Sequence, residues 1–126
     1  MRIKINIILR CKWTAKEIIE KYWETQNEGD YTKVVDLFSD DAILEDPIYG
    51  KFEGKKEIAK FMQKMTNEMG ARNISFIAKD IDGDGEVAWA QWTAFTPDGE
   101  MEGCGLYRVK NEKMVYYKDY MNAPKD

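Results

Sequence analysis

The chain has 126 residues, of which 44% are hydrophobic and 13% aromatic, and its formal net charge is −4. This length fits one domain with a core of ordinary size, and the composition excludes an intrinsically disordered chain. A negative chain without a basic block is not expected to bind nucleic acid or a membrane surface. Because there is no histidine and only Cys11 and Cys104 as cysteines, Cys-His nucleophiles, His-containing triads and zinc sites are excluded. We expect both cysteines to be reduced, buried thiols, and we expect no metal site.

In residues 1–12 a period of two places Ile3, Ile5, Ile7 and Leu9 on one face, which predicts a strand. The segment is too short and too charged to span a membrane, and it has no signal-peptide cleavage site. We therefore expect a cytoplasmic protein with an N-terminal extension, 1–12, followed by a single domain, 13–126.

Helices are predicted next. Thr14 and Glu17 have the spacing of a capping box, and apolar residues follow at helical spacing as far as Trp23. Gly29 predicts the end of this helix, and Asp30 predicts the N-cap of a short second helix.

An extended segment is predicted over 42–46 and closed by Pro47, and a third helix is predicted over 54–69. Beyond Arg72 the apolar period changes to two, which predicts strands at about 72–80, 86–96, 100–109 and 113–121. Helices followed by a run of antiparallel strands indicate an α+β fold.

The strand region contains two tryptophans close in sequence and one segment that resembles a calcium-binding loop. Trp89 and Trp92 are three residues apart, so they should lie on opposite faces of one strand, one inside the curved sheet and one outside. The segment 80–85 matches the first half of a calcium-binding EF-hand loop. The twelfth position of such a loop requires a glutamate, and here that position is Gln91. We therefore expect a hairpin turn there.

Several short motifs occur together in an order typical of one superfamily. They are Gly29-Asp30, Phe38-Ser39-Asp40-Asp41-Ala42, Glu45-Asp46-Pro47, Gly54-Lys55-Lys56-Glu57-Ile58 and Tyr116-Tyr117-Lys118-Asp119-Tyr120. The chain resembles the nuclear-transport-factor-2-like superfamily, in its SnoaL-like and ketosteroid-isomerase-like branch. The resemblance implies a cone-shaped fold, in which three N-terminal helices pack in a strongly curved, mostly antiparallel sheet that encloses an apolar pocket. The superfamily contains isomerases, polyketide cyclases, epoxide hydrolases, dehydratases and non-catalytic binding proteins, so the fold alone does not give the function.

The same resemblance implies roles for individual residues. Asp46 takes the place of the general base and Tyr22 that of the oxyanion donor. The third group of the isomerase site, an aspartic acid, falls at Gly105, and a second hydrogen-bonding aromatic residue falls at Met62. Asp119 is the natural replacement for the missing acid, since it shares a strand face with the pocket-lining position.

Further ligand contacts are expected from the same resemblance, at Phe38, Tyr49, Phe61, Met62, Met65, Tyr107, Tyr117 and Met121. Structural alternatives stay open for the three catalytic candidates. Asp46 before Pro47 also fits a turn, and Tyr22 fits the core. Asp119 also fits a pairing with the neighbours of Lys118 or with Arg108 at a strand end. The methionines also fit simple packing.

These observations predict a protein that binds a small apolar or carbonyl-containing molecule. The leading hypothesis is an isomerase or cyclase that needs no cofactor; the alternative is a non-catalytic ligand-binding or protein-interaction module of the same fold. An outward-facing tryptophan together with Tyr116 and Tyr120 also predicts a homodimer through the outer sheet face.

Overall fold

The computed structural model describes residues 13–70 and 72–121. The strand predicted over 1–12 and Cys11 lie outside the described residues. The elements, in chain order, are α2 (Ala15–Gln26), the 3-10 helix η1 (Tyr31–Leu37), β1 (Phe38–Asp46), β2 (Gly50–Glu53), α3 (Lys55–Met69), β3 (Ser75–Gly83), β4 (Val87–Thr96), β5 (Gly99–Lys110) and β6 (Lys113–Met121).

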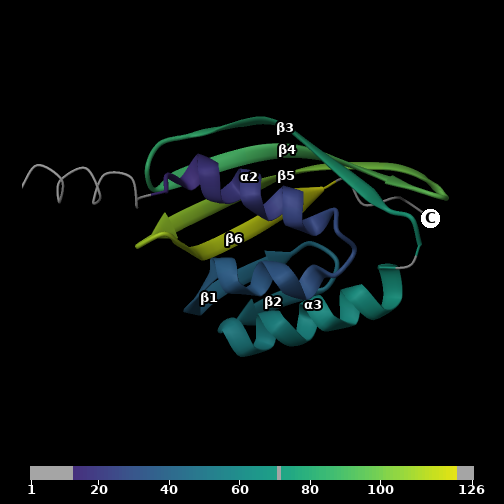
Figure 1. The fold of residues 1–126 in the computed structure, drawn as a ribbon, viewed down its shortest axis with the longest axis horizontal. Coiled ribbons are helices and arrows are strands. Elements are labelled where there is room, and N and C mark those ends of the chain that lie inside the picture. Colours follow the sequence, from purple (N-terminus) through teal and green to yellow (C-terminus); the bar gives the residue numbers. More distant parts are fainter. Residues whose placement is uncertain (1–12, 71, 122–126) are drawn as a thin grey trace, which may run out of the picture.

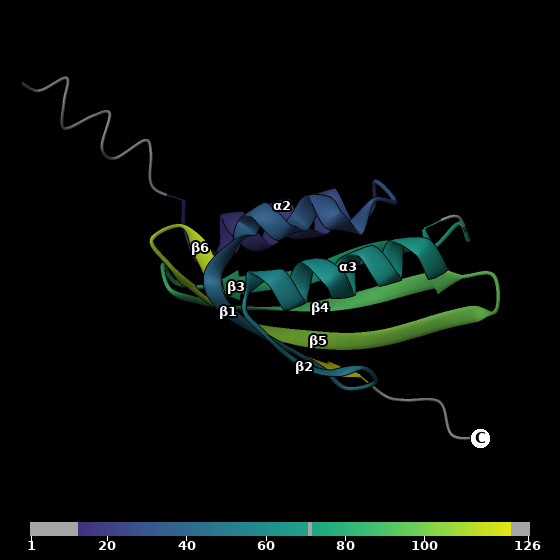
Figure 2. The ribbon, with the colours of Figure 1, turned by 90° about the horizontal axis from the view of Figure 1, so that it is seen from below.

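The six strands form one sheet in the order β2-β1-β6-β5-β4-β3. Only β1 and β6 run parallel, and every other neighbouring pair is antiparallel. Figures 1 and 2 show α2, η1 and α3 on the same face of the curved sheet, with the opposite face left uncovered by these elements. The predicted α+β class is confirmed, and so is the mostly antiparallel sheet.

The first helix begins as its sequence predicts. The Glu17 amide donates to Thr14 Oγ1 at 3.2 Å, and the Thr14 amide donates to Glu17 Oε1 at 2.9 Å. This reciprocal pair satisfies two of the amides that a helix start leaves without a partner. The capping box therefore sets the register in which Tyr22 and Trp23 face the sheet.

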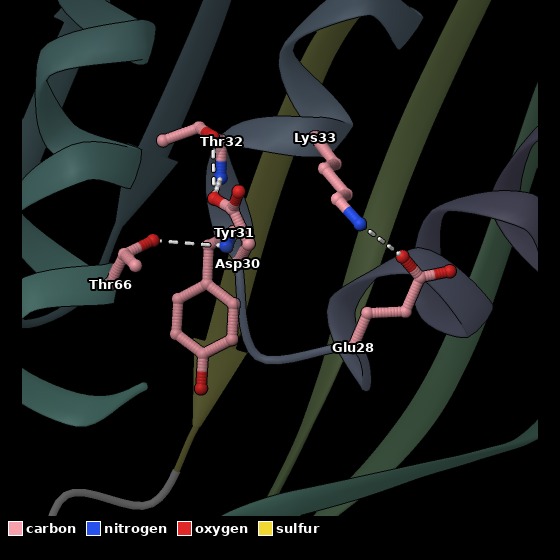
Figure 3. A network of polar contacts seen from close by, with 6 residues as sticks. All are labelled: Glu28, Asp30, Tyr31, Thr32, Lys33 and Thr66. Carbon is pink, nitrogen blue, oxygen red and sulfur yellow. Dashed lines mark hydrogen bonds and ion pairs between the residues drawn. The ribbon is translucent and has the colours of Figure 1, made fainter. Parts of the chain in front are cut away.

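The turn after α2 joins three elements through polar contacts (Figure 3). Asp30 Oδ1 accepts a 3.0 Å hydrogen bond from the Thr32 amide, and this caps η1. The Tyr31 amide donates to Thr66 Oγ1 of α3 at 2.9 Å. The start of η1 is thereby held against the last turn of α3.

Two predicted elements differ from the structure. The short second helix is a 3-10 helix, and the extended segment begins at Phe38 rather than at residue 42. A four-residue strand, β2, was not predicted at all. It pairs with β1 through Leu44 and Phe52, and since only Phe52 is even partly buried there, it carries no periodic apolar signal.

The closing strand contains an irregularity that its alternating pattern did not reveal. The pairing register of β5 and β6 shifts between Arg108 and Val109, and Val115 is left without a partner there. Both Met114 and Tyr117 are therefore buried, although strict alternation would place them on opposite faces. Beyond the bulge the alternation resumes toward Asp119.

The two tryptophans of β4 lie on opposite faces, as predicted. Trp92 is 4% exposed inside the curved sheet, whereas Trp89 is 47% exposed on the outer face. The predicted hairpin turn is confirmed between β3 and β4. The expectation of a buried thiol at position 104 is wrong, since Cys104 is exposed on β5. Among the described residues no helix is both long enough and apolar enough to cross a bilayer.

Candidate functional site

A cavity of about 140 Å³ lies between the helices and the inner face of the sheet, and we call it the central cavity. Its walls come from every helix and strand except η1 and β2, and most of its lining is apolar. An apolar cavity of about 150 Å³ holds a benzene molecule, so this one has room for a single ring. The lining residues are Tyr22, Trp23, Gln26, Leu44, Asp46, Ile48, Tyr49, Phe61, Met62, Met65, Met69, Phe76, Trp92, Met101, Tyr117 and Asp119.

Asp46 ends β1 at one side of this cavity. Its Oδ1 accepts hydrogen bonds from the amides of Ile48 at 2.8 Å and Tyr49 at 2.9 Å. Asp46 therefore makes the turn that Asp-Pro sequences favour, and it also lines the cavity. Among the described residues, no donor reaches its second oxygen, Oδ2.

Asp119 stands beside Asp46 on the neighbouring strand. The parallel pairing of Glu45 with Lys118 puts the two aspartates one position further along β1 and β6, on the same face of the sheet. Trp92 donates its indole N–H to Asp119 Oδ1 at 2.8 Å. The ion pair predicted as the alternative for Asp119 is not found, because none of the ion pairs of the described residues involves Asp119.

Burial raises the pKa of Asp119 to about 7, and the nearby negative charge of Asp46 adds to the rise. The hydrogen bonds from Trp92 and Tyr117 oppose this rise, because they stabilise the charged form. At neutral pH a large share of Asp119 is thus a neutral acid beside Asp46. A pair of carboxyl groups whose environments differ in this way is the arrangement from which acid and base roles are assigned.

Tyr22 reaches the same side of the cavity from α2. Its side chain is 3% exposed, and its ring meets that of Tyr117 edge to face at 5.5 Å. Burial raises the pKa of Tyr22 well above 10, and Tyr107, Asp119 and Asp46 raise it further. The phenol therefore keeps its proton and is a hydrogen-bond donor in a poorly solvated place.

Two further tyrosines, Tyr107 and Tyr117, pack against the ring of Tyr22. The Tyr107 and Tyr117 rings stack at 4.5 Å, and the Trp23 indole donates to the Tyr107 hydroxyl at 3.0 Å. Gly105 makes the space for them, because a Cβ there would lie 2.7 Å from the Tyr107 hydroxyl oxygen. The position that resembles the third acid of the isomerase thus has no room for a side chain, and its cross-strand partner is Asp119.

The other residues predicted to contact a ligand divide into two groups. Tyr49, Phe61, Met62, Met65 and Tyr117 line the central cavity. Phe38 and Tyr107 are fully buried and do not line it, and Met121 lines shallow hollows beside Tyr120.

Sequence reasoning missed two polar groups of this cavity. Trp92, the hydrogen-bond donor to Asp119, was left without an assigned face, and Gln26 was not considered. Gln26 lies four residues after Tyr22, so the helical period was the signal that could have placed both on one face. In the described part of the chain, no group of three or more acidic or cysteine side chains lies close enough together to hold a metal ion.

Comparison with known proteins bears on the family and the fold. A family model described as a SnoaL-like domain matches residues 19–117. No curated protein matches the chain in sequence.

Solved structures match over most of the chain. A candidate polyketide cyclase from Pseudomonas putida KT2440 superposes with a TM-score of 0.70 at 23% identity, over 87% of this chain and 92% of that one. A candidate ketosteroid isomerase from Kribbella flavida gives a TM-score of 0.73 at 16% identity, over 88% and 79%. An NTF2-like protein of unknown function from Cytophaga hutchinsonii gives 0.70 at 12% identity, over 89% and 94%. At these identities the likeness establishes a shared fold.

Proposed function

Because this chain belongs to the SnoaL-like domain family, we propose that it binds a small carbonyl compound in the central cavity and moves a proton on it. The observation that carries the proposal is the grouping of Asp46, Asp119 and Tyr22 at one side of an apolar cavity. A carboxylate, a neutral acid and a protonated phenol are the groups that enolate chemistry needs. The similarity to structures named as a candidate isomerase and a candidate polyketide cyclase supports the same class of reaction.

The proposed reaction begins with Asp46. Its carboxylate takes a proton from the carbon next to the carbonyl group, so the C–H bond breaks and an O–H bond forms on Asp46. The electron pair moves to the carbonyl oxygen, which accepts hydrogen bonds from Tyr22 and from protonated Asp119. In an isomerisation Asp46 returns the proton to another carbon of the conjugated enolate. In a cyclisation the enolate carbon attacks a second carbonyl, a C–C bond forms as the C=O π bond breaks, and the alkoxide that results takes the proton back from Asp46. Neither route requires a cofactor.

The apolar surroundings increase the effect of these groups. Hydrogen bonds to a developing negative charge are stronger where water is excluded, and removing one such donor typically slows a reaction by about 10²–10³-fold. Asp119 pairs across the strands with Gly105, where the third acid of the isomerase site would fall but has no room. Asp119 can therefore take the place of that acid. The indole of Trp92 holds the Asp119 carboxyl in place.

The test is deuterium uptake in heavy water, followed by proton NMR, with a panel of cyclic enones and β-diketones. We expect wild-type protein to exchange the protons next to the carbonyl group, and Asp46→Asn to exchange none above background. Asparagine keeps an Oδ1 that accepts the Ile48 and Tyr49 amides, so the turn and the fold are expected to persist.

The control is Asp40→Asn, which makes the same chemical change at an exposed position of the same strand. We expect it to exchange at the wild-type rate. Equal exchange by wild type and Asp46→Asn would disprove the role of Asp46 as base.

A second function, binding without reaction, is favoured by one observation. Asp46 Oδ1 is already used by two amides of the following turn, as a purely structural aspartate would be. In that case the compounds that perturb the fluorescence of the cavity tryptophans, Trp23 and Trp92, would bind and remain unchanged in heavy water.

A further inference from the structure

Gln26 is the polar group of the central cavity for which the proposed reaction has no use. It lies in the last turn of α2, one turn beyond Tyr22, and it lines the cavity. Its Oε1 atom is buried and has no hydrogen-bond partner among the described residues. A buried acceptor without a partner is costly, so such an atom in a native fold calls for an explanation.

The surroundings of Gln26 place it away from the two aspartates. Asn27, its neighbour, exchanges two hydrogen bonds of 2.7 Å with the backbone of Phe76, which anchors the end of α2 against β3. Asp119 is on β6, and the strand order places two strands, β5 and β4, between β6 and β3. Three strand spacings of about 4.8 Å each separate the two strands. Gln26 therefore lies toward the β3 side of the cavity, one helical turn beyond Tyr22, and the reactive carboxyl groups lie on the β1 and β6 side.

The groups between these two sides are apolar. The Trp23 ring lies 5.5 Å from Phe76 and 6.1 Å from Trp92, and all three residues line the cavity. A ligand that fills this space thus meets polar groups at its carbonyl end, then aromatic rings, and then the amide of Gln26.

We propose that Gln26 binds a hydroxyl group at the end of the ligand remote from the carbonyl group. The inference rests on the proposed function and specifies its substrate as a hydroxylated cyclic carbonyl compound with one ring. A hydroxyl group is favoured over other polar groups because it both donates and accepts a hydrogen bond. It therefore pairs with the Gln26 amide whichever way that amide is turned.

The test uses two matched sets of compounds. One set is 4-(ω-hydroxyalkyl)cyclohex-2-enones with one to four methylene groups, and the other is the corresponding 4-alkyl compounds that end in methyl. The graded length covers the distance across the cavity. Binding is measured by the fluorescence of Trp23 and Trp92, and a net hydrogen bond predicts about three- to tenfold tighter binding of the best hydroxylated compound over its methyl partner.

Two variants decide whether Gln26 causes this preference. Gln26→Met keeps a similar length and removes the polar group, so we expect the hydroxyl preference to disappear while the methyl series binds at least as well. Its thermal unfolding temperature should equal or exceed that of wild type, because an unpaired buried acceptor is gone. Met69→Leu, a change in another lining residue without loss of a polar group, should alter both series alike.

Deuterium exchange on the same compounds separates this inference from the proposed function. If wild-type protein exchanges protons on both series but binds the hydroxylated and methyl compounds equally well, the proposed role of Gln26 is disproved and that of Asp46 is not affected. A preference that persists in Gln26→Met, or failure of both series to bind, also overturns it. A hydroxyl preference without any exchange supports Gln26 and counts against the proposed reaction.

Discussion

Asp119 couples the stability of this fold to pH because its pKa differs between the folded and unfolded chain. Burial raises the pKa of Asp119 from its ordinary 3.8 to about 7. The folded state then binds a proton more tightly than the unfolded state, so this contribution to stability is present below pH 4 and is lost as pH rises to 7. One pKa unit corresponds to about 1.4 kcal/mol, which makes the loss a few kcal/mol at most.

The variant Asp119→Asn isolates this effect. Asparagine does not titrate, and its oxygen still accepts the Trp92 indole N–H. We expect urea unfolding to show wild-type stability falling relative to the variant between pH 4 and pH 7. A constant difference between the two proteins over that range would show that Asp119 has an ordinary pKa. The lowered pKa values of Asp30 and Asp84 act at lower pH and are common to both proteins.

Gly105 is the position where a missing side chain decides the shape of the site. A Cβ there would lie 2.7 Å from the Tyr107 hydroxyl oxygen and 2.9 Å from Tyr117 Cε1. These atoms belong to stacked, buried rings that have little freedom to move. We expect Gly105→Ala to destabilise the protein by about 1–3 kcal/mol, as overpacking does.

Urea unfolding measures this cost, with Gly85→Ala as the matched change. A Cβ on Gly85 meets no atom within 4 Å, so that variant should be close to wild type. Equal stability of the two variants would contradict the idea that Gly105 makes room for the tyrosine pair.

Among the elements, α2 supplies two of the polar groups of the site, Tyr22 and Gln26, together with Trp23. Its start depends on the capping box of Thr14 and Glu17. Thr14→Ala removes the acceptor of the Glu17 amide, and the loss of such a cap typically costs about 1 kcal/mol.

The expected result of Thr14→Ala is a lower urea midpoint with an unchanged slope. Lys16→Ala, an exposed change in the same first turn, should leave the midpoint close to that of wild type. A Thr14→Ala variant as stable as wild type would mean that packing alone positions α2.

At the scale of the whole molecule, the outer face of the sheet remains to be explained. Ile77, Trp89 and Tyr120 are 47%, 47% and 48% exposed there, and a hollow lies between Trp89, Cys104 and Tyr120. Tyr116, also expected in this patch, is half-buried and donates its hydroxyl to Glu45 Oε2 at 2.5 Å. We propose that this face pairs with a second copy of the chain, because large exposed apolar groups that gather on one face are typical of interfaces.

Sedimentation analysis tests this pairing. We expect a dimer for the wild type and a shift to monomer for the double variant Trp89→Ser, Tyr120→Ser, with intact near-ultraviolet circular dichroism. The control is Trp13→Ser, which removes a 47% exposed tryptophan at the start of α2. A wild-type protein that sediments as a monomer at every accessible concentration would disprove the proposal.

Local patterns by themselves determined most of the elements. Caps and helical spacing placed α2 and α3, and alternation placed β4, β5 and β6 to within a few residues, because these signals act between neighbours in the sequence. They failed for β2, which is short and almost wholly exposed, and for the bulge at Val115, which depends on the partner strand.

The residues of the site also fall into those that the sequence predicted and those that it did not. Asp46, Tyr22 and Asp119 were named from the sequence through its family resemblance, and the family was confirmed. Only the tertiary structure decided that Trp92 holds Asp119, that Gly105 makes room for the tyrosine pair and that Gln26 lines the cavity with a buried, unpaired acceptor among the described residues. The physical reason is that these contacts join residues distant in sequence, so they depend on strand order and helix placement, which short patterns do not encode.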